Sequence, residues 1–357
     1  TPAELYSQRF GAPWLGGLFF LVFTTYTLPY MVIAVKGTAL TLAGITEGAI
    51  PIWAGGLGVI AFTALYTAVG GMRATAWTNV LQGALFLSFM VASFFLMSSS
   101  MGGLAEATEA VRAQNADLLR IGEGRYYDPR KWASWGLIIA LAPIAFPHML
   151  VRLMAARDER AIQGVCRLYP LALAALWIPA VMIGVWGAAA FPGLEGRASD
   201  SVYSLMSAAH LPSWMGPLSV VVVLAAAMST LDAQILTLSS MLVRDVLDRL
   251  VPGQTRNDVL TGRLFGLVVA AIVYVLFLSW GSSLFKMAEI SFSGYTTLVP
   301  AMFLGVRWKR FTAWGAGASI VAANAALFLG MAGHLPLFGF LPEKADRADD
   351  DQGDHRG

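Results

Sequence analysis

The feature that most limits what this chain can fold into is a recurring run of about 20 residues with almost no charge, the length of a membrane-spanning helix. Of the 357 residues, 57% are hydrophobic and 13% are charged, whereas a soluble domain carries about 25% charged residues. This composition excludes a soluble globular enzyme, a disordered chain and a nucleic-acid-binding protein. The single cysteine, Cys166, excludes a disulfide-stapled module. An outer-membrane barrel would need strands of about 10 residues with alternating polarity, and the sequence has no such pattern.

Nine candidate spans follow one another, joined by mostly short polar connectors. They are expected at about 12–35, 51–69, 76–99, 133–151, 168–191, 214–243, 262–284, 286–306 and 311–333. The connector at 100–132 has apolar residues at helical spacing and predicts a surface helix. The sequence therefore predicts an all-α polytopic membrane protein with a single transmembrane domain at 1–333 and a charged, disordered tail at 334–357. Because the first residue is Thr1 and not methionine, we expect the chain to be part of a longer protein.

Arginine and lysine residues are divided unevenly between alternate connectors. The connectors at 152–167 and 244–263 are rich in arginine, and those on the other side of the predicted membrane, including 100–132, carry fewer positive charges. Loops rich in arginine and lysine stay on the cytoplasmic side. We therefore expect 152–167 and 244–263 to be cytoplasmic and 100–132 to be external.

Few ionisable residues fall inside or at the edge of the predicted spans, and each needs a partner. They are His148, Asp232, Lys286 and Glu289. A charge at the bilayer centre costs about 2.5–3.5 kcal/mol on insertion scales, so each should face protein, water or an ion. Two prolines stand four residues apart in LAPIAFPHMLVR. Because proline removes a backbone donor, this stretch predicts a broken helix beside a cavity or packed protein.

The most informative polar stretch is VVVLAAAMSTLDAQILTLSSMLVRDV, in the predicted span at 214–243. Ala226, Ser229 and Thr230 share one helical face that is small and rich in hydroxyl groups. Such a face suits a close helix–helix seam in which serine and threonine bond back to their own helix. Hydroxyl oxygens beside a backbone carbonyl also suit a monovalent cation that prefers oxygen ligands. From the residues alone both interpretations stay open.

Four stretches, in order along the chain, resemble the sodium:solute symporter family of sodium/proline, sodium/pantothenate and sodium/sugar transporters. They are the stretch just quoted, LYTAVGGMRATAWTNVLQGALF, FPHMLVRLMAARDERAI and PAMFLGVRWKRFTAWGAGASI. The resemblance implies a LeuT-like fold of two inverted five-helix repeats. In that fold the chain would hold core helices three to ten and one more. Residues 12–99 would be the remainder of the first repeat, 133–306 the second repeat, and 311–333 an additional helix, with the first two core helices absent.

The resemblance also implies where sodium binds, as the coupling ion and without any other cofactor or metal. The half of the core sodium site that comes from the eighth helix falls on the Ala226 carbonyl and the Ser229 and Thr230 hydroxyls. Some family members have a second site with an aspartate at the position of Asn79. Here Asp232 lies where that site has hydroxyls, so a carboxylate moved to Asp232 defines a candidate second cation site with Asn79. The alternative is a structural Asp232, bonded to Asn79 or to a cytoplasmic arginine without an ion.

Substrate contacts implied by the resemblance fall on several of the predicted spans. The candidates are Thr24, Tyr26, Ala140, Pro143, Ile144, Glu289, Ser293 and Tyr295. The stretch around Pro143 is apolar, whereas a sugar site needs many hydrogen-bonding side chains because a buried unpaired hydroxyl costs about 1–3 kcal/mol. An amino acid or a monocarboxylate therefore fits better than a sugar. For His148 we expect a helix-capping or inner-gate role.

The resemblance implies a sodium-coupled symporter that imports a small organic solute across the inner (plasma) membrane, with the lipid bilayer as its surroundings. Such a protein carries out no covalent chemistry, so we do not expect an enzyme. Two alternatives remain open at this stage. One is a membrane sensor module of symporter-like fold attached to a signalling protein, and the other is a truncated remnant that no longer transports.

Overall fold

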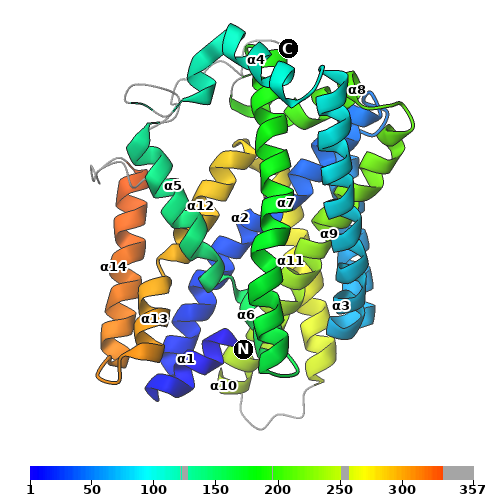
Figure 1. The fold of residues 1–357 in the computed structure, drawn as a ribbon. Coiled ribbons are helices and arrows are strands. Elements are labelled where there is room, and N and C mark those ends of the chain that lie inside the picture. The colour runs from blue at the N-terminus through cyan, green and yellow to red at the C-terminus, as the bar shows by residue number, and fades with distance from the viewer. Residues whose placement is uncertain (121, 123–127, 195, 251–256, 333–357) are drawn as a thin grey trace.

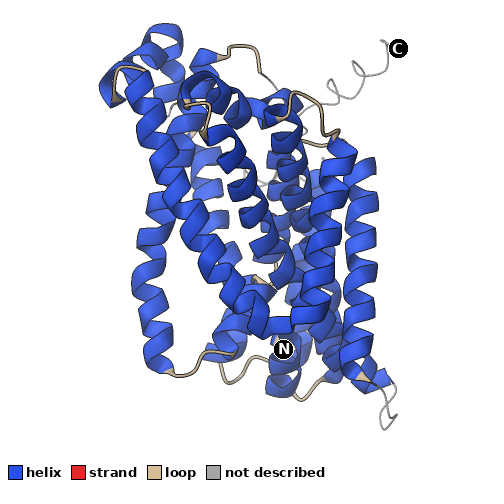
Figure 2. Ribbon diagram, turned by 90° about the vertical axis from the view of Figure 1, so that its right-hand side faces the viewer, coloured by secondary structure: helices blue, strands red, loops and turns tan. Residues whose placement is uncertain are grey.

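The computed structural model describes residues 1–332 apart from 121, 123–127, 195 and 251–256. The expected tail at 334–357 and the last residue of the expected span at 311–333 lie outside the described residues. Within the described ranges every regular element is helical (Figure 2). The all-α prediction is therefore confirmed.

The longer helices are bundled roughly along one direction, and shorter ones cover the two ends (Figure 1). The α-helices are α1 (Pro2–Phe10), α2 (Pro13–Ile45), α3 (Ile52–Ser100), α4 (Leu104–Asn115), α5 (Pro129–Leu141), α6 (Pro147–Met154), α7 (Glu159–Ala190), α8 (Val202–His210), α9 (Met215–Met241), α10 (Asp248–Leu250), α11 (Asp258–Ser279), α12 (Leu284–Thr296), α13 (Val299–Arg307) and α14 (Ala313–Met331). Short 3-10 segments are η1 (Ala116–Leu119), η2 (Ala142–Ala145) and η3 (Gly196–Ser201), and a π-helical turn, η4 (Leu242–Leu247), continues α9.

Among the described residues, six helices are long and apolar enough to cross a membrane, or seven if the bent pair α5–α6 is one span. The six are α2, α3, α7, α9 with η4, α11 and α14. Each of the nine expected spans corresponds to helical structure. Helix α3 contains the spans expected at 51–69 and 76–99, and the span expected at 286–306 is divided between α12 and α13. Two helices extend well beyond the expected spans. Helix α2 continues to Ile45, although residues 36–45 were expected in a connector, and α7 begins at Glu159, although residues 159–167 were expected in one.

Helix α3 reverses direction at Gly71. An unbroken helix of 49 residues would be about 74 Å long, far more than the hydrocarbon core of about 30 Å. Gly71 has φ 61° and ψ −166°, a conformation that favours glycine. Gly56 packs against Phe277 near the end of α11, Gly71 lies near the first turns of α11, and Phe89 packs with Met215 at the start of α9. The two halves therefore run in opposite directions.

Helix α2 lies at the centre of the bundle and separates two hydrophobic clusters. On one side, Phe19 and Phe23 pack with residues of α12, α13 and α14; on the other, Met31 and Val35 pack with α3, α9 and α11. Lipid is as apolar as these side chains, so close packing holds membrane helices together more than burial does. Gly294 illustrates this, because a Cβ there would overlap the Tyr26 ring.

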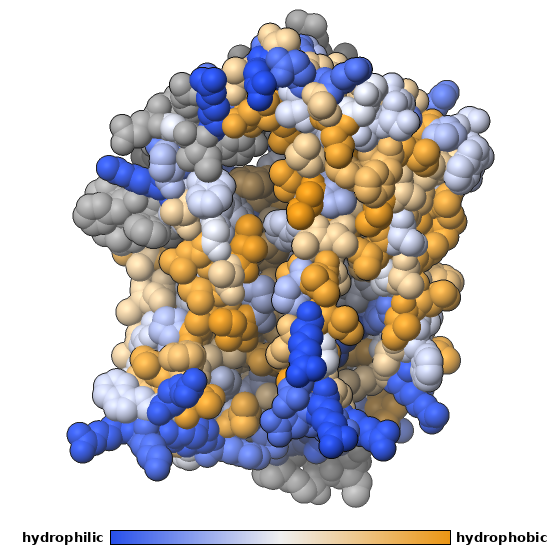
Figure 3. All heavy atoms as spheres, viewed as in Figure 1, coloured by the Kyte–Doolittle hydropathy of each residue, from blue (hydrophilic) through white to orange (hydrophobic). Residues whose placement is uncertain are grey.

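Hydrophobic side chains cover the middle of the molecule, and hydrophilic ones gather toward its ends. Figure 3 shows a broad orange band on one face with blue side chains at the lower edge. The expected surface helix in 100–132 is α4, at the upper end, whereas the connector before α7 and helix α10 lie at the lower end (Figure 1). The described parts of the two arginine-rich connectors thus share one end, as the predicted orientation requires.

We expect a cysteine at Ala113 to react from outside the cell and one at Ala161 to react only from inside. Both side chains are exposed, on α4 and at the start of α7. The native Cys166 is exposed too, so the variants are made in a Cys166→Ser background of the full-length protein. The measurement is labelling of intact cells by a membrane-impermeant maleimide, with permeabilised cells as the control. External labelling of Ala161→Cys but not of Ala113→Cys would show that the protein has the opposite orientation.

Candidate functional site

Three oxygen atoms converge in the middle of α9. The Ser229 hydroxyl donates to the Ala226 carbonyl at 2.8 Å, and the Thr230 hydroxyl approaches the same carbonyl at 3.3 Å. The spacing predicted from the sequence therefore does bring these groups together on one helical face. All three residues are half-buried, so the cluster is not sealed within the packing of the described residues. A carbonyl and two hydroxyls at this spacing offer oxygen ligands on one side of a small cation.

The predicted helix break separates α5 from α6 and lies near the centre of the bundle. The two helices are bent by 46°, and the 3-10 segment η2 joins them. Pro143 lies inside η2 and Pro147 begins α6, so each proline occupies a position where its missing N–H is tolerated. Segment η2 contacts both α12 and α13. The break therefore faces elements from the second half of the chain.

Aromatic rings surround the break. Phe146 has its ring centroid 4.9 Å from Tyr295 and 5.5 Å from Tyr30, and the His148 ring stacks on Phe146 at 5.4 Å. The Nδ1 atom of His148 has no hydrogen-bond partner among the described residues. The sequence identified His148 and Tyr295, but Tyr30 and Phe146 were missed. The position of Phe146 directly before the second proline of the break could have identified it as part of this cluster.

The buried carboxylate of Asp232 lies in a polar network that joins three helices, α3, α6 and α9. Tyr66 of α3 donates a hydrogen bond to Oδ2 at 2.8 Å, and Asn79, beyond the reversal of α3, donates to Oδ1 at 3.2 Å. The Arg152 guanidinium, at the end of α6, lies 3.6 Å from Oδ1. Asp232 itself is 0% exposed. The expected approach of Asn79 and Asp232 is thus present, and so is the arginine of the structural alternative.

More oxygen acceptors surround this network than its hydrogen bonds use. The side chains of Thr67 and Gln82 lie next to the Tyr66 hydroxyl. Within the described ranges, Thr67 Oγ1, Asn79 Oδ1 and Gln82 Oε1 are buried without a hydrogen-bond partner. The sequence analysis missed Tyr66 and Gln82 as members of this network, and it expected a cytoplasmic arginine at Asp232 without identifying it as Arg152. Tyr66, Gln82 and Arg152 all lie in the quoted motifs. The glycine pair at which α3 reverses could have predicted that Tyr66 and Asn79 lie close together.

The substrate candidates do not form one continuous group. Tyr26 donates a hydrogen bond to Asn324 of α14 at 2.6 Å, and the Tyr295 hydroxyl lies 2.7 Å from that of Thr27. Both tyrosine hydroxyls are therefore engaged within the core. The hydroxyls of Thr24 and Ser293 are buried without a partner among the described residues.

The remaining candidates lie on the broken helix and on α12. Ala140 and Ile144 are exposed, and Pro143 between them is half-buried. Glu289 is half-buried as well, and Lys286 and Lys131 are the cations near it. The structure thus brings Tyr295 to the break beside Phe146 and leaves Ala140 and Ile144 on an open surface.

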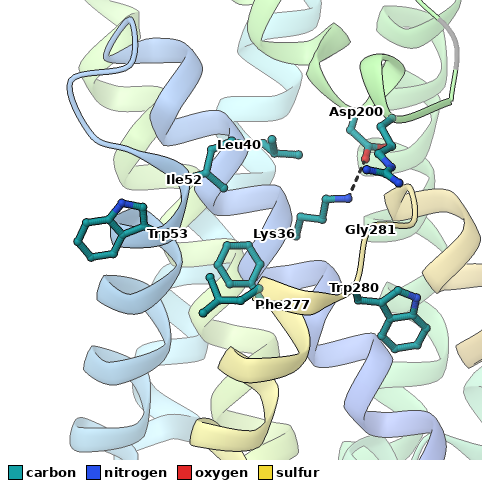
Figure 4. A pocket seen from close by; sticks show the side chains of 10 residues that line it. Lys36, Leu40, Ile52, Trp53, Asp200, Phe277, Trp280 and Gly281 are labelled. Carbon is teal, nitrogen blue, oxygen red and sulfur yellow. Dashed lines mark ion pairs between the residues drawn. The ribbon is translucent and has the colours of Figure 1, made fainter. Parts of the chain in front are cut away.

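A pocket of about 380 Å³ opens at the end of the bundle that we expect to be external. Figure 4 shows the Lys36 side chain directed toward Asp200, with Trp53 and Trp280 on opposite sides. Lys36 Nζ lies 3.7 Å from Asp200 Oδ2, and the two side chains are 13% and 6% exposed. Lys36 also donates to the Ser282 carbonyl. These contacts explain why α2 continues past Lys36 where a connector was expected.

Burial raises the pKa of the Asp200 carboxyl, and the Leu284 amide and the Lys36 ammonium oppose that rise. Asp200 accepts hydrogen bonds from the Leu284 amide at 3.1 and 3.2 Å. The carboxylate therefore ties η3 both to α2 and to the turn that precedes α12.

We expect Asp200→Asn to destabilise the protein by about 3 kcal/mol, because it leaves the mostly buried Lys36 charge without its partner. Adding Lys36→Met should restore part of that loss, since no unpaired charge remains. The measurement is thermal unfolding in detergent of both single variants and the double variant. Glu109→Ala is the matched control, because its ion pair with Arg112 is well exposed and should contribute below about 1 kcal/mol. Equal effects for Asp200→Asn and the control would contradict the expectation.

Comparison with known proteins gives a family, several relatives and a structural neighbour. The model of the sodium:solute symporter family matches residues 1–323. The sodium/proline symporter of Salmonella typhimurium (strain LT2) is 26% identical over 302 residues, covering 82% of this chain and 59% of the relative. The sodium/pantothenate symporter of Haemophilus influenzae is 24% identical over 281 residues, covering 77% of this chain and 58% of the relative. The chain thus spans about 59% of the length of such curated relatives.

A solved structure shows the arrangement of the helices. It is the substrate-bound outward-open state of a Na⁺-coupled sialic acid symporter, with a TM-score of 0.74 and 18% identity, covering 93% of this chain and 72% of that chain. The likeness establishes the LeuT-like fold that the four motifs predicted.

Proposed function

The chain belongs to the sodium:solute symporter family, and from that premise we propose that the full-length protein is a sodium-coupled secondary transporter that imports a small organic solute. The observation that carries the proposal is the convergence of the Ser229 and Thr230 hydroxyls on the Ala226 carbonyl. That cluster lies in a multi-pass membrane protein, at mid-span of α9. No covalent step is needed, because the sodium gradient supplies the free energy for uptake, and we place the protein in the plasma membrane.

The proposed sodium ion binds the oxygens of Ala226, Ser229 and Thr230. The described residues supply one side of the coordination sphere. Because the chain spans about 59% of its relatives' length, we propose that a segment outside the described residues completes the sphere. Sodium bound between α9 and that segment would hold the two together and stabilise the outward-open state. Release of sodium to the cytoplasm would then accompany release of the solute.

We propose a second, weaker cation site around Asp232. The unpartnered acceptors Asn79 Oδ1 and Gln82 Oε1 support it, since oxygen acceptors are what a cation needs. The Arg152 guanidinium competes with that cation, because it lies 3.6 Å from the same carboxylate. A cation would therefore bind there when α6, which carries Arg152, moves away from α9.

For the solute, we propose an amino acid or a monocarboxylate bound near the break between α5 and α6. The apolar and aromatic surroundings of Pro143, Phe146 and Tyr295 support this choice, because they offer few hydrogen bonds for a sugar. The relatives named for proline and pantothenate transport small organic molecules that carry a carboxyl group. Tyr26 has its hydroxyl engaged with Asn324, and we propose that it shapes the pocket from behind.

The test is uptake by membrane vesicles that contain the full-length protein. A panel of labelled amino acids and monocarboxylates is offered with and without an inward sodium gradient. We expect at least one solute to accumulate only when the gradient is present. Accumulation that ignores sodium, or no accumulation of any solute by well-folded protein, would contradict the proposal and favour a sensor or a non-transporting remnant.

A further inference from the structure

A second cavity, of about 320 Å³, lies at the end of the molecule that we expect to face the cytoplasm. It is lined by the reversal of α3 at Gly71, by the end of α9 with η4, and by the first turns of α11. Its wall is mostly apolar, and its polar lining residues are Thr67, Ser239, Ser240, Arg244, Asp258 and Arg263. None of these residues belongs to the proposed sodium site on Ala226, Ser229 and Thr230.

The polar lining has unused hydrogen-bond donors. Arg244 on η4 and Arg263 on α11 are exposed, and within the described ranges neither has a hydrogen bond or an ion pair. The Ser239 hydroxyl is buried at 7% exposure and has no partner there either. Asp258 is engaged in an interaction of its own. Two free guanidinium groups and a buried free hydroxyl around one cavity suit an oxygen-rich anion, because arginine binds phosphate through paired hydrogen bonds.

Exposed apolar residues lie at the cavity and next to it along the chain. Met72 of α3 and Val259 of α11 line the cavity and are exposed, and Leu260 and Leu264 are further exposed hydrophobic residues on the first turns of α11. In a membrane protein such side chains contact lipid. A ligand in this cavity therefore has cations at its polar end and a bilayer-facing apolar surface next to it.

We propose that this cavity binds the phosphate group of an anionic glycerophospholipid from the cytoplasmic leaflet. Arg244 and Arg263 hold the phosphate from two helices, and Ser239 donates to one of its oxygens or to the rest of the head group. The acyl chains lie along the exposed apolar residues of α3 and α11. Basic pockets between membrane helices on the cytoplasmic side are known to take such head groups. The proposal does not depend on sodium coupling.

Gly262 gives a way to close the cavity without changing its charge. A Cβ at Gly262 would lie 3.9 Å from Ser239 Cβ and from Val243 Cγ2, which is ordinary contact. A leucine there starts without a clash and projects its larger side chain toward α9. The helix should tolerate Gly262→Leu, because leucine is a better helix former than glycine.

The experiment is native mass spectrometry of the full-length protein titrated with phosphatidylglycerol or with phosphatidylethanolamine. We expect the wild type to bind one phosphatidylglycerol in preference to phosphatidylethanolamine. The Arg244→Gln/Arg263→Gln double variant should lose affinity for phosphatidylglycerol by a factor of about ten or more, since each arginine near the head group adds attraction. Arg157→Gln/Arg160→Gln is the matched control, because these two exposed arginines lie at the same end but away from the cavity. That variant should bind as the wild type does.

Gly262→Leu should also lose the preferred lipid, although both arginines are kept. Thermal unfolding of each variant shows whether it is folded. The proposal is overturned if the control double variant loses lipid as strongly as the Arg244/Arg263 variant, since the effect would then be general surface charge. It is also overturned if Gly262→Leu binds normally, or if inorganic phosphate at equal concentration displaces the lipid, which would mark a site for a free anion.

Discussion

Replacing Ser229 and Thr230 together with alanine is expected to raise the sodium concentration for half-maximal uptake at least about ten-fold, which corresponds to about 1.4 kcal/mol. The Ala226 carbonyl would be left as the only ligand from α9. A partly dehydrated cation cannot replace two lost oxygen ligands from a rigid helix. By contrast, a hydroxyl in a helix–helix seam contributes on average about 0.6 kcal/mol, so the variant should still fold.

The matched control for this variant is Ser219→Ala. Ser219 lies on the same helix, is fully buried, and donates to the Met215 carbonyl at 2.9 Å. Ser219→Ala therefore removes a hydroxyl that bonds to a carbonyl of its own helix, as those of Ser229 and Thr230 do, but that lies away from the proposed ion. The measurement is uptake at a series of sodium concentrations, with thermal unfolding alongside. If the double variant and the control both keep the wild-type sodium curve, the hydroxyls of Ser229 and Thr230 belong to a packing seam only.

Much of the fold could be predicted because each membrane helix is a single continuous apolar stretch of the sequence. The apolar runs located the spans, and the two prolines at 143 and 147 located the break that bends α5 against α6 by 46°. The spacing of Ala226, Ser229 and Thr230 fixed their common face, since a helix places residues three and four apart next to one another. Such local rules needed no knowledge of the tertiary structure.

The partners of Asp232 could not be predicted in the same way. Tyr66 is 166 positions away along the chain, and it reaches Asp232 only because α3 reverses at Gly71 and brings both of its halves against α9. Arg152 reaches Asp232 because the broken helix brings the end of α6 to α9. Likewise, Lys36 was expected in a connector because its charge ends an apolar run. Its ion pair with Asp200 depends on η3, which sequence alone does not place.

The competition between Arg152 and a cation for Asp232 leads to the second large effect. Replacing Arg152 with glutamine leaves a fully buried carboxylate with only the neutral donors Tyr66 and Asn79. The Arg152 side chain is 45% exposed, so solvent screens part of the ion pair, but the fully buried carboxylate loses the one cationic partner it has among the described residues. If Asp232 binds a cation, sodium should take the place of the guanidinium and restore part of this loss. We therefore expect Arg152→Gln to unfold at a clearly lower temperature in potassium, and sodium to raise its unfolding temperature more than it raises that of the wild type.

The companion variants decide whether the carboxylate takes part in coupling. Asp232→Asn is expected to lower the apparent sodium affinity of uptake or to remove one coupled cation. Adding Asn79→Asp should recover part of the loss, because Asn79 Nδ2 lies 3.2 Å from Asp232 Oδ1 and the charge returns to the same place. Sodium curves for the wild type, the single and the double variant, at several pH values, measure both effects. A carboxylate that only ties Tyr66, Asn79 and Arg152 together would give a different result: Asp232→Asn would leave the sodium curve unchanged at every pH, and sodium would not stabilise Arg152→Gln beyond the wild type.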